Sequence, residues 1–197
     1  MRLEKLGLFI VVMIISYFIN TYYFDKLLKV FNIISVTAYI LNRVSLALFL
    51  YCILELIFFE KKQSVNLLIY KFTIIYFIWL TGLLFGRIAN LSEYNLSSRF
   101  NFVSFIPKWI NHLDNKLVLY YLIGNVLVYI PIGLIFRYFK SFIYSFIYCF
   151  LLILLFETLQ AVTNLGYFDI DDIILNSIGA LMGILFMHLY KKIIINH

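Results

Sequence analysis

Charged side chains are scarce in this chain. Asp, Glu, Lys and Arg make up 13% of its 197 residues, whereas hydrophobic residues make up 64%. Soluble domains are about half apolar and about one quarter charged. The composition therefore excludes a soluble domain and predicts an integral membrane protein, with a length that suits one transmembrane domain over residues 1–197.

Cysteine is also scarce, and the common nucleophile motifs are absent. The two cysteines, Cys52 and Cys149, lie inside apolar runs, where a thiol behaves as a small apolar group. We expect no disulfide or metal role for them. The sequence contains no His pair, Cys pair, GxSxG motif or glycine-rich phosphate loop, so nucleophilic catalysis by Ser or Cys has little support.

The net charge of +6 does not indicate a nucleic-acid partner. Lys and Arg are scattered at the ends of apolar runs and form no basic face of the kind that nucleic-acid binding requires. At those positions they orient the chain in a membrane and contact anionic lipid headgroups. We therefore predict membrane lipids as partners and no nucleic acid.

Long apolar runs dominate what remains. A helix needs roughly twenty mostly apolar residues to cross the hydrocarbon core. We predict an all-α membrane bundle of about six spans, at Leu6–Tyr22, Ser35–Phe59, Leu67–Phe85, Leu117–Phe136, Phe142–Ala161 and Ile173–Tyr190. Arg43 and Glu55 interrupt the second span about three helical turns apart, too far to pair with each other. Each needs a partner elsewhere or must snorkel, and we interpret both as structural residues.

The distribution of Lys and Arg predicts the orientation. One side of the membrane receives the basic residues Arg2, Lys5, Lys61, Lys62, Arg137, Lys140, Lys191 and Lys192. Both termini are therefore predicted on the cytoplasmic side. Lys26 and Lys29 fall on the opposite side, and they weaken this prediction without reversing it. The segment Arg87–Lys116 and the turn Val162–Asp172 then emerge together on the outer face, the first of them partly in the interface.

Polar residues gather at the span ends next to these outer segments. Glu157 and Gln160 lie on one helical face, and Asn164 joins them if the helix continues that far. Asp169, Asp172 and Asn176 have the same spacing at the start of the last span. Charge at a membrane boundary is costly without a partner or a task, so we predict a functional site here.

Structural interpretations remain open for these residues. Asp169 or Asp171 suits a helix cap. Asn125 suits either a contact between helices or a contact to substrate.

The flanking Pro131 and glycines shape the fourth and sixth spans. Pro131 frees the carbonyl of Leu127 and bends the fourth span. Gly124 and Gly133 there, and the Gly179–Gly183 GxxxG pattern on the last span, predict close helix packing.

The outer segment contains SSRFNFVSFIPKW. Its aromatic residues suit the headgroup region of a membrane, so the segment is either an interfacial anchor or part of the site. Arg99 can reach a phosphate or a carboxylate there.

Three motifs in this order resemble the VanZ-like family of small bacterial membrane proteins: NFVSF, GNVLVYIPIG and ETLQ…FDIDDIILNSIGALMG, over about residues 99–183. The named member of that family is associated with resistance to the glycopeptide antibiotic teicoplanin, so the resemblance implies a similar role and a location in the bacterial cytoplasmic membrane.

The resemblance also implies which residues matter. They are Arg99, Asn101, Asn125, Pro131, Gly133, Glu157, Gln160, Asp169, Asp172, Asn176 and Gly179. Two departures stand out: Ser104 replaces a usual proline, and the arginine that usually precedes the acidic motif is absent. If that arginine neutralises the acids or binds an anion, this protein either has lost that partner or supplies Arg99 instead.

Two hypotheses follow. In the first, the protein is an enzyme that acts on an envelope lipid or lipid-linked glycan at the outer leaflet. Glu157 is the general acid or base, Asp169 and Asp172 hold Mg²⁺ or Ca²⁺, and Arg99, Asn101, Asn125, Gln160 and Asn176 bind substrate. In the second, it binds a lipoglycopeptide, a lipid-linked cell-wall precursor or a partner protein without catalysis. A small transporter is a third, weaker alternative.

Overall fold

The structure is a computed structural model that describes residues 2–30, 33, 35–59, 64–87 and 96–195. Within these residues, six helices are long and apolar enough to cross a membrane. This confirms the predicted multi-pass helical fold. The chain divides into two compact units, Met1–Ala89 and Asn90–His197, which are described in turn. The prediction of a single membrane domain stays a prediction.

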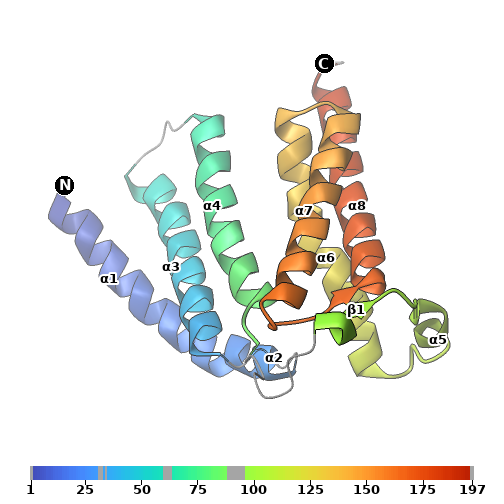
Figure 1. Cartoon of the computed structure of the whole chain (residues 1–197). Coiled ribbons are helices and arrows are strands. Elements are labelled where there is room, and N and C mark those ends of the chain that lie inside the picture. The colour runs from blue at the N-terminus through green and yellow to red at the C-terminus, as the bar shows by residue number, and fades with distance from the viewer. Residues whose placement is uncertain (1, 31–32, 34, 60–63, 88–95, 196–197) are drawn as a thin grey trace. The chain divides into compact units, whose positions relative to one another are not determined.

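The N-terminal unit contains three of these helices (Figure 1). The first is built of α1 (Arg2–Ile19), a π-helical turn η1 (Asn20–Phe24) and α2 (Asp25–Val30), and is followed by α3 (Val36–Phe58) and α4 (Val65–Leu84). Ser35 and Ser64 cap α3 and α4, each accepting a backbone hydrogen bond from the first turn. The first span reaches Lys29, beyond the predicted end at Tyr22, because the helix continues through the π-helical turn.

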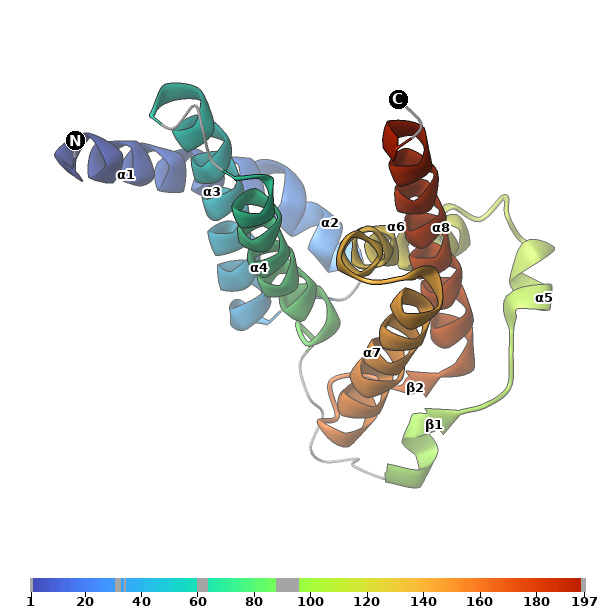
Figure 2. The same cartoon turned by 90° about the horizontal axis from the view of Figure 1, so that it is seen from above.

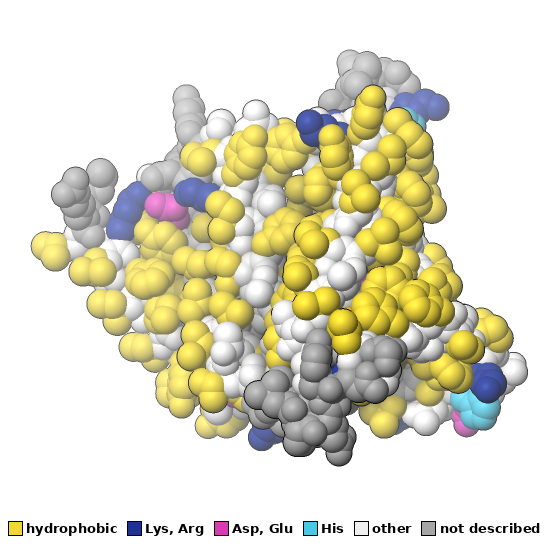
Figure 3. All heavy atoms as spheres, in the orientation of Figure 1, with side chains coloured by type: hydrophobic (Ala, Val, Ile, Leu, Met, Phe, Trp, Pro, Cys, Tyr) yellow, Lys and Arg dark blue, Asp and Glu magenta, His cyan; other side chains and the backbone are white. Residues whose placement is uncertain are grey.

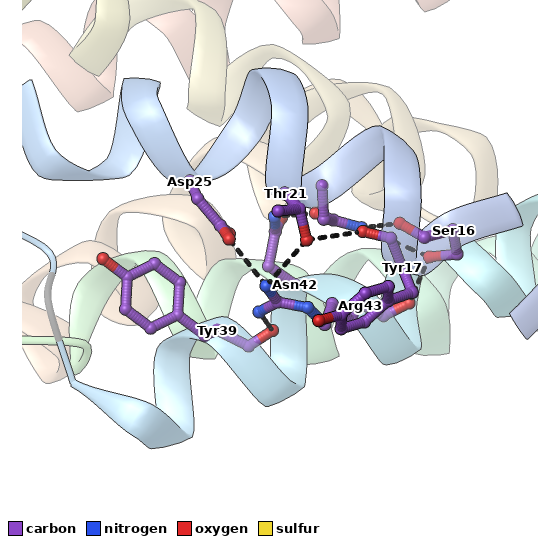
Figure 4. A network of polar contacts seen from close by, with 8 residues as sticks. Ser16, Tyr17, Thr21, Asp25, Tyr39, Asn42 and Arg43 are labelled. Carbon is purple, nitrogen blue, oxygen red and sulfur yellow. Dashed lines mark hydrogen bonds and ion pairs between the residues drawn. The ribbon is translucent and has the colours of Figure 1, made fainter. Parts of the chain in front are cut away.

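Arg43 has its expected partner on the first span (Figure 4). Its Nη2 lies 2.6 Å from Oδ2 of Asp25, and the guanidinium lies over the rings of Tyr17 and Tyr39. The buried amides of Asn20 and Asn42 bond to each other beside this ion pair. These contacts join α3 to the first span, which agrees with a structural role for Arg43.

Glu55 lies in a second ionic contact of the same unit. Its two carboxylate oxygens are each 3.0 Å from an ammonium group, one from Lys5 and one from Lys71. The carboxylate thus links α1, α3 and α4. Lys61 and Lys62, which contributed to the predicted orientation, lie outside the described residues.

The C-terminal unit holds the other three long helices and the short outer elements (Figures 1 and 2). In chain order these are η3 (Leu96–Arg99), β1 (Phe100–Asn101), α5 (Ile106–Ile110), α6 (Lys116–Phe139), α7 (Phe142–Val162), β2 (Phe168–Asp169) and α8 (Ile170–Ile195). The predicted spans four to six match α6, α7 and α8 to within a few residues.

Glycine allows α6 and α8 to touch backbone to backbone. A Cβ atom at Gly179 or Gly183 would lie 2.0 Å from the carbonyl oxygen of Val126 or Ile130 on α6, and a Cβ at Gly133 would lie 2.0 Å from that of Ala180 on α8. The predicted packing role of these glycines is confirmed. The same prediction is wrong for Gly124, because a Cβ there would meet nothing within 4 Å.

The far end of this unit is basic. Lys191 donates hydrogen bonds to the carbonyl oxygens of Arg137 and Tyr138 at the C-terminal end of α6, and Arg137 contacts His188. The predicted grouping of Arg137 and Lys191 at one end is thereby confirmed. Between the two ends, hydrophobic side chains cover much of the surface in view (Figure 3), as expected for helices that face lipid.

Candidate functional site

The segment before α6 and the turn after α7 meet as two short parallel strands, β1 and β2 (Figure 2). Phe100 pairs with Phe168, and Asn101 pairs with Asp169. The side chains at the second position also touch, since Nδ2 of Asn101 lies 3.3 Å from Oδ2 of Asp169. This confirms that the motifs before α6 and after α7 converge, as the predicted topology requires.

Asp169 has the capping role that was one of its two interpretations. It directly precedes α8, and its Oδ1 accepts a hydrogen bond of 3.0 Å from the backbone N–H of Asp171 in the first turn. Carboxylates at this position also interact favourably with the helix dipole. Asp169 therefore links β1, β2 and the start of α8.

Asp171 ties the outer segment to α8. Its side chain is fully buried, and Oδ2 accepts a hydrogen bond of 2.8 Å from the backbone N–H of Phe105. The other oxygen, Oδ1, is buried and has no hydrogen-bond partner among the described residues. Asp171 was expected to be a cap or to point away from the site, yet it is the most buried of the three aspartates.

Asp172 faces α6. Its Oδ1 accepts hydrogen bonds from the hydroxyl of Tyr121 and, at 2.7 Å, from Nδ2 of Asn125. Tyr121 and Asn125 lie one turn apart on α6, so both donors reach the same carboxylate. Asn125 thus joins two helices, which was the structural interpretation, and does so at the carboxylate that we predict to be functional.

Glu157 and Gln160 approach the same strands from α7. Glu157 is buried, and its Oε2 lies 3.4 Å from the backbone nitrogen of Asp169. The side chain of Gln160 packs against Gly166 in the following turn. Glu157 therefore lies next to the residue that caps α8.

The helix α7 ends before Asn164, so the shared helical face does not extend to it. Asn164 adopts a left-handed conformation with φ of 60°. The N–H of Leu165 bonds to the carbonyl of Gln160, and the N–H of Asn164 bonds to that of Ala161, which is a Schellman ending. This turn directs the chain back along the end of the bundle towards β2.

Asn176 lies one turn further along α8, on the face that packs against α6. It is 1% exposed, and its Oδ1 has no hydrogen-bond partner among the described residues. Helical side chains tilt towards the N-terminus, so the Asn176 amide points back towards Asp172. Gly179, on the same face, touches Val126.

The comparison with known proteins decides the family. The family model described as VanZ/LLP1 matches residues 45–191. The chain belongs to the VanZ/LLP1 family. Neither the curated proteins nor the solved structures provide a match.

The match to the VanZ/LLP1 family covers more of the chain than the motifs did. It begins in α3 of the N-terminal unit and ends near the end of α8. Of the predicted site residues, the structure brings together Asn101, Asp169 and Glu157 at the strands. It brings Asn125 and Asp172 together at the α6–α8 contact.

Arg99 lies beside these strands in the VanZ/LLP1 chain. Its guanidinium carbon is 4.6 Å from the ring centre of Tyr167, a cation–π contact. Tyr167 belongs to the stretch that has no arginine of its own, so Arg99 brings a cation to the predicted position. No ion pair joins Arg99 to a carboxylate in the part of the chain that the structure describes.

The described residues contain no group of three or more His, Cys, Asp or Glu side chains that could hold a metal ion. Asp169 and Asp172 accept hydrogen bonds from Asn101, Tyr121 and Asn125. The Mg²⁺ or Ca²⁺ site that the sequence suggested for Asp169 and Asp172 therefore stays a prediction, in which water or substrate would supply the other oxygen ligands.

Two residues of this VanZ/LLP1 site were not predicted from the sequence. Tyr121 precedes Asn125 by four residues, and this helical spacing was the signal available for it. Phe105 contributes only its backbone N–H to Asp171, so no side-chain pattern could have identified that contact. The edge of Trp109 then packs on Tyr121 with 4.6 Å between ring centres.

Proposed function

We propose that this VanZ/LLP1 protein binds the polar headgroup of an envelope lipid or lipid-linked glycan and acts on it. The site lies at the outer leaflet of the bacterial cytoplasmic membrane, with both termini in the cytoplasm. The resemblance noted above implies a role in resistance to glycopeptides such as teicoplanin.

The observation that carries the proposal is the burial of polar side chains at one end of an apolar bundle. Glu157, Asp171 and Asn176 are each at most 1% exposed, although such groups are costly inside a membrane protein and mark functional sites there. They come from α7 and α8, and their neighbours come from β1 and α6. A capping role accounts for Asp169 but not for Glu157 or Asn176.

The arrangement suits acid–base chemistry on a headgroup. Oε2 of Glu157 lies 3.4 Å from the backbone nitrogen of Asp169, and a buried carboxylate next to a binding site can transfer a proton. Asp172 accepts hydrogen bonds from Tyr121 and Asn125, so it is held in place to position substrate. Arg99, beside Tyr167, contacts an anionic group such as a phosphate.

The test is to compare the envelope composition of cells by mass spectrometry. Cells express the wild type, Glu157→Gln, Asp172→Asn or no protein, at matched membrane levels, and teicoplanin susceptibility is read from the same cultures. Asp114→Asn is the matched control, because Asp114 is an exposed carboxylate outside the site.

We expect one lipid or glycan species to change with the wild type and with Asp114→Asn, and not with Glu157→Gln or Asp172→Asn. If the composition never changes while susceptibility still follows the wild-type protein, acid–base catalysis by Glu157 is refuted.

That second result would favour a binding protein without catalysis, which limits the access of a lipoglycopeptide. The observation that supports this alternative is the aromatic cluster at the strands. The rings of Phe100, Phe102 and Phe168 pack against one another, and Phe102 remains 68% exposed. In that case Phe102→Ala would weaken resistance more than Glu157→Gln.

A further inference from the structure

The buried end of α8 offers hydrogen-bond acceptors without matching donors. Oδ1 of Asp171 and Oδ1 of Asn176 are both buried and have no hydrogen-bond partner among the described residues. Unsatisfied buried acceptors cost about 1–3 kcal/mol each, so they require a partner that the described residues do not supply.

Four donors that the described residues bring to this end of the bundle are already engaged. The Tyr121 hydroxyl and the Asn125 amide bond to Asp172. The Asn101 amide bonds to Asp169, and the Phe105 N–H bonds to Asp171. A ligand that fits the remaining acceptors must therefore bring donors.

The charge of the cluster selects among such ligands. Glu157, Asp169, Asp171 and Asp172 place four carboxylates around β2 and the first turn of α8, and the nearby cation Arg99 lies over Tyr167. Attraction between charges is several-fold stronger in a buried site than in water. A positively charged donor is thus preferred to a neutral hydroxyl.

A bare metal ion is less favoured here, because the described residues contain no group of three ligating side chains that could hold one. A primary ammonium group carries three N–H donors, no acceptor and one positive charge. It satisfies isolated acceptors such as Asn176 Oδ1 without needing a closed coordination shell.

We propose that the ligand of this site carries a primary amine, whose ammonium group donates to Asn176 Oδ1 beside the carboxylate of Asp172. This inference rests on the proposed headgroup-binding site and names the class of its ligand. The amine belongs to an aminolipid headgroup or to an amino group on a lipid-linked glycan. An anionic group next to the amine lies within reach of Arg99.

The first experiment measures lipid binding to the purified full-length protein in nanodiscs of phosphatidylglycerol. Phosphatidylethanolamine is titrated in, and the lipid retained by the protein is counted by native mass spectrometry. N-acetylated phosphatidylethanolamine lacks the charge, and phosphatidylcholine keeps the charge but has no N–H donor. We expect phosphatidylethanolamine to bind at least about tenfold more tightly than either analogue, the range of a hydrogen bond to a charged group.

A second arm separates the two sources of the amine. Soluble ethanolamine and glucosamine compete for the bound lipid, with their N-acetyl forms as controls. Competition by glucosamine with little retention of phosphatidylethanolamine assigns the amine to a glycan. Both arms use the wild-type protein alone. Equal binding of the amine and N-acetyl forms in both arms overturns the proposal.

Variants test the position of the amine. Asn176→Leu removes the free acceptor and is expected to abolish the preference for amine over N-acetyl forms. Asp114→Asn removes an exposed carboxylate and should keep that preference. A preference unchanged in folded Asn176→Leu refutes the assignment to Asn176.

The two proposals fail separately. If no amine preference exists while envelope composition still depends on Glu157, the amine inference fails and the proposed function stands. If the amine preference depends on Asn176 while Glu157→Gln changes neither composition nor susceptibility, the binding site stands and catalysis by Glu157 fails.

Discussion

Replacement of Gly179 by alanine tests one of the three close glycine contacts between α6 and α8. The new Cβ would lie 2.0 Å from the carbonyl oxygen of Val126, whereas carbon–oxygen contacts between helices are about 3.3–3.6 Å. To remove the clash, α8 must move away from α6 by roughly 1.3 Å. The hydrogen bond of 2.7 Å between Asn125 and Asp172 lies two turns away and would then exceed normal hydrogen-bond length.

The expected cost follows from this displacement. Overpacking of this kind costs about 1–3 kcal/mol, which corresponds to a fall of roughly 2–12 °C in the unfolding midpoint for a chain of this size. We would measure the midpoint of the purified protein in detergent by intrinsic fluorescence. Gly179→Ala should also weaken teicoplanin resistance, because it loosens the residues that hold Asp172.

Gly124→Ala is the matched control on α6. A Cβ at Gly124 meets nothing within 4 Å, and alanine is a better helix former than glycine by up to about 1 kcal/mol. This variant should be as stable as the wild type or slightly more stable. Equal midpoints for Gly179→Ala and Gly124→Ala would refute the close backbone contact between α6 and α8.

Three further outcomes are expected. Tyr121→Phe removes a hydrogen-bond donor from Asp172 and should reduce the proposed teicoplanin resistance. The free energy of unfolding should fall by no more than about 1.5–3 kcal/mol, so loss of the protein from the membrane would contradict this prediction. Arg43→Leu leaves Asp25 without its cation and should lower the free energy of unfolding by roughly 1–3 kcal/mol, less than for a fully buried pair because this pair is partly exposed. Leucine at both positions should recover part of that loss, as measured by thermal unfolding. Asn164→Gly should be tolerated, whereas Asn164→Val should cost about 1–2 kcal/mol because φ is positive there; equal unfolding midpoints would refute that strain.

The long helices could be predicted from the sequence because hydrocarbon imposes one simple requirement, a run of about twenty apolar residues. The boundaries of α3 and α7 agree with the predicted spans to within a residue. The first span was predicted to end at Tyr22, whereas the helix continues to Lys29, past the polar residues Asn20 and Asp25. In the structure they are paired with Asn42 and Arg43, so their polarity does not end the helix.

The site was less predictable because its details depend on the backbone. Helical spacing placed Asp172 and Asn176 on one face, and the structure confirms that this face meets α6. Two contacts of the site depend on backbone groups, which every residue carries. They are the parallel strand pairing of Asn101 with Asp169 and the N–H of Phe105, which donates to Asp171. The sequence pattern therefore gave no sign of them, and Asp171 was assigned too small a role.

The pairing of β1 with β2 has a consequence for the assembly of the protein in the membrane. Its two strands are separated along the chain by all of α6 and α7, so neither has a partner until two complete spans have been inserted. Bringing such distant segments together carries the loop-closure cost before any contact forms. A chain that stops after α6 lacks β2 and the acidic start of α8, and a chain that inserts α7 in the wrong direction cannot place β2 beside β1. The proposed binding site therefore requires that the last three spans have the correct topology.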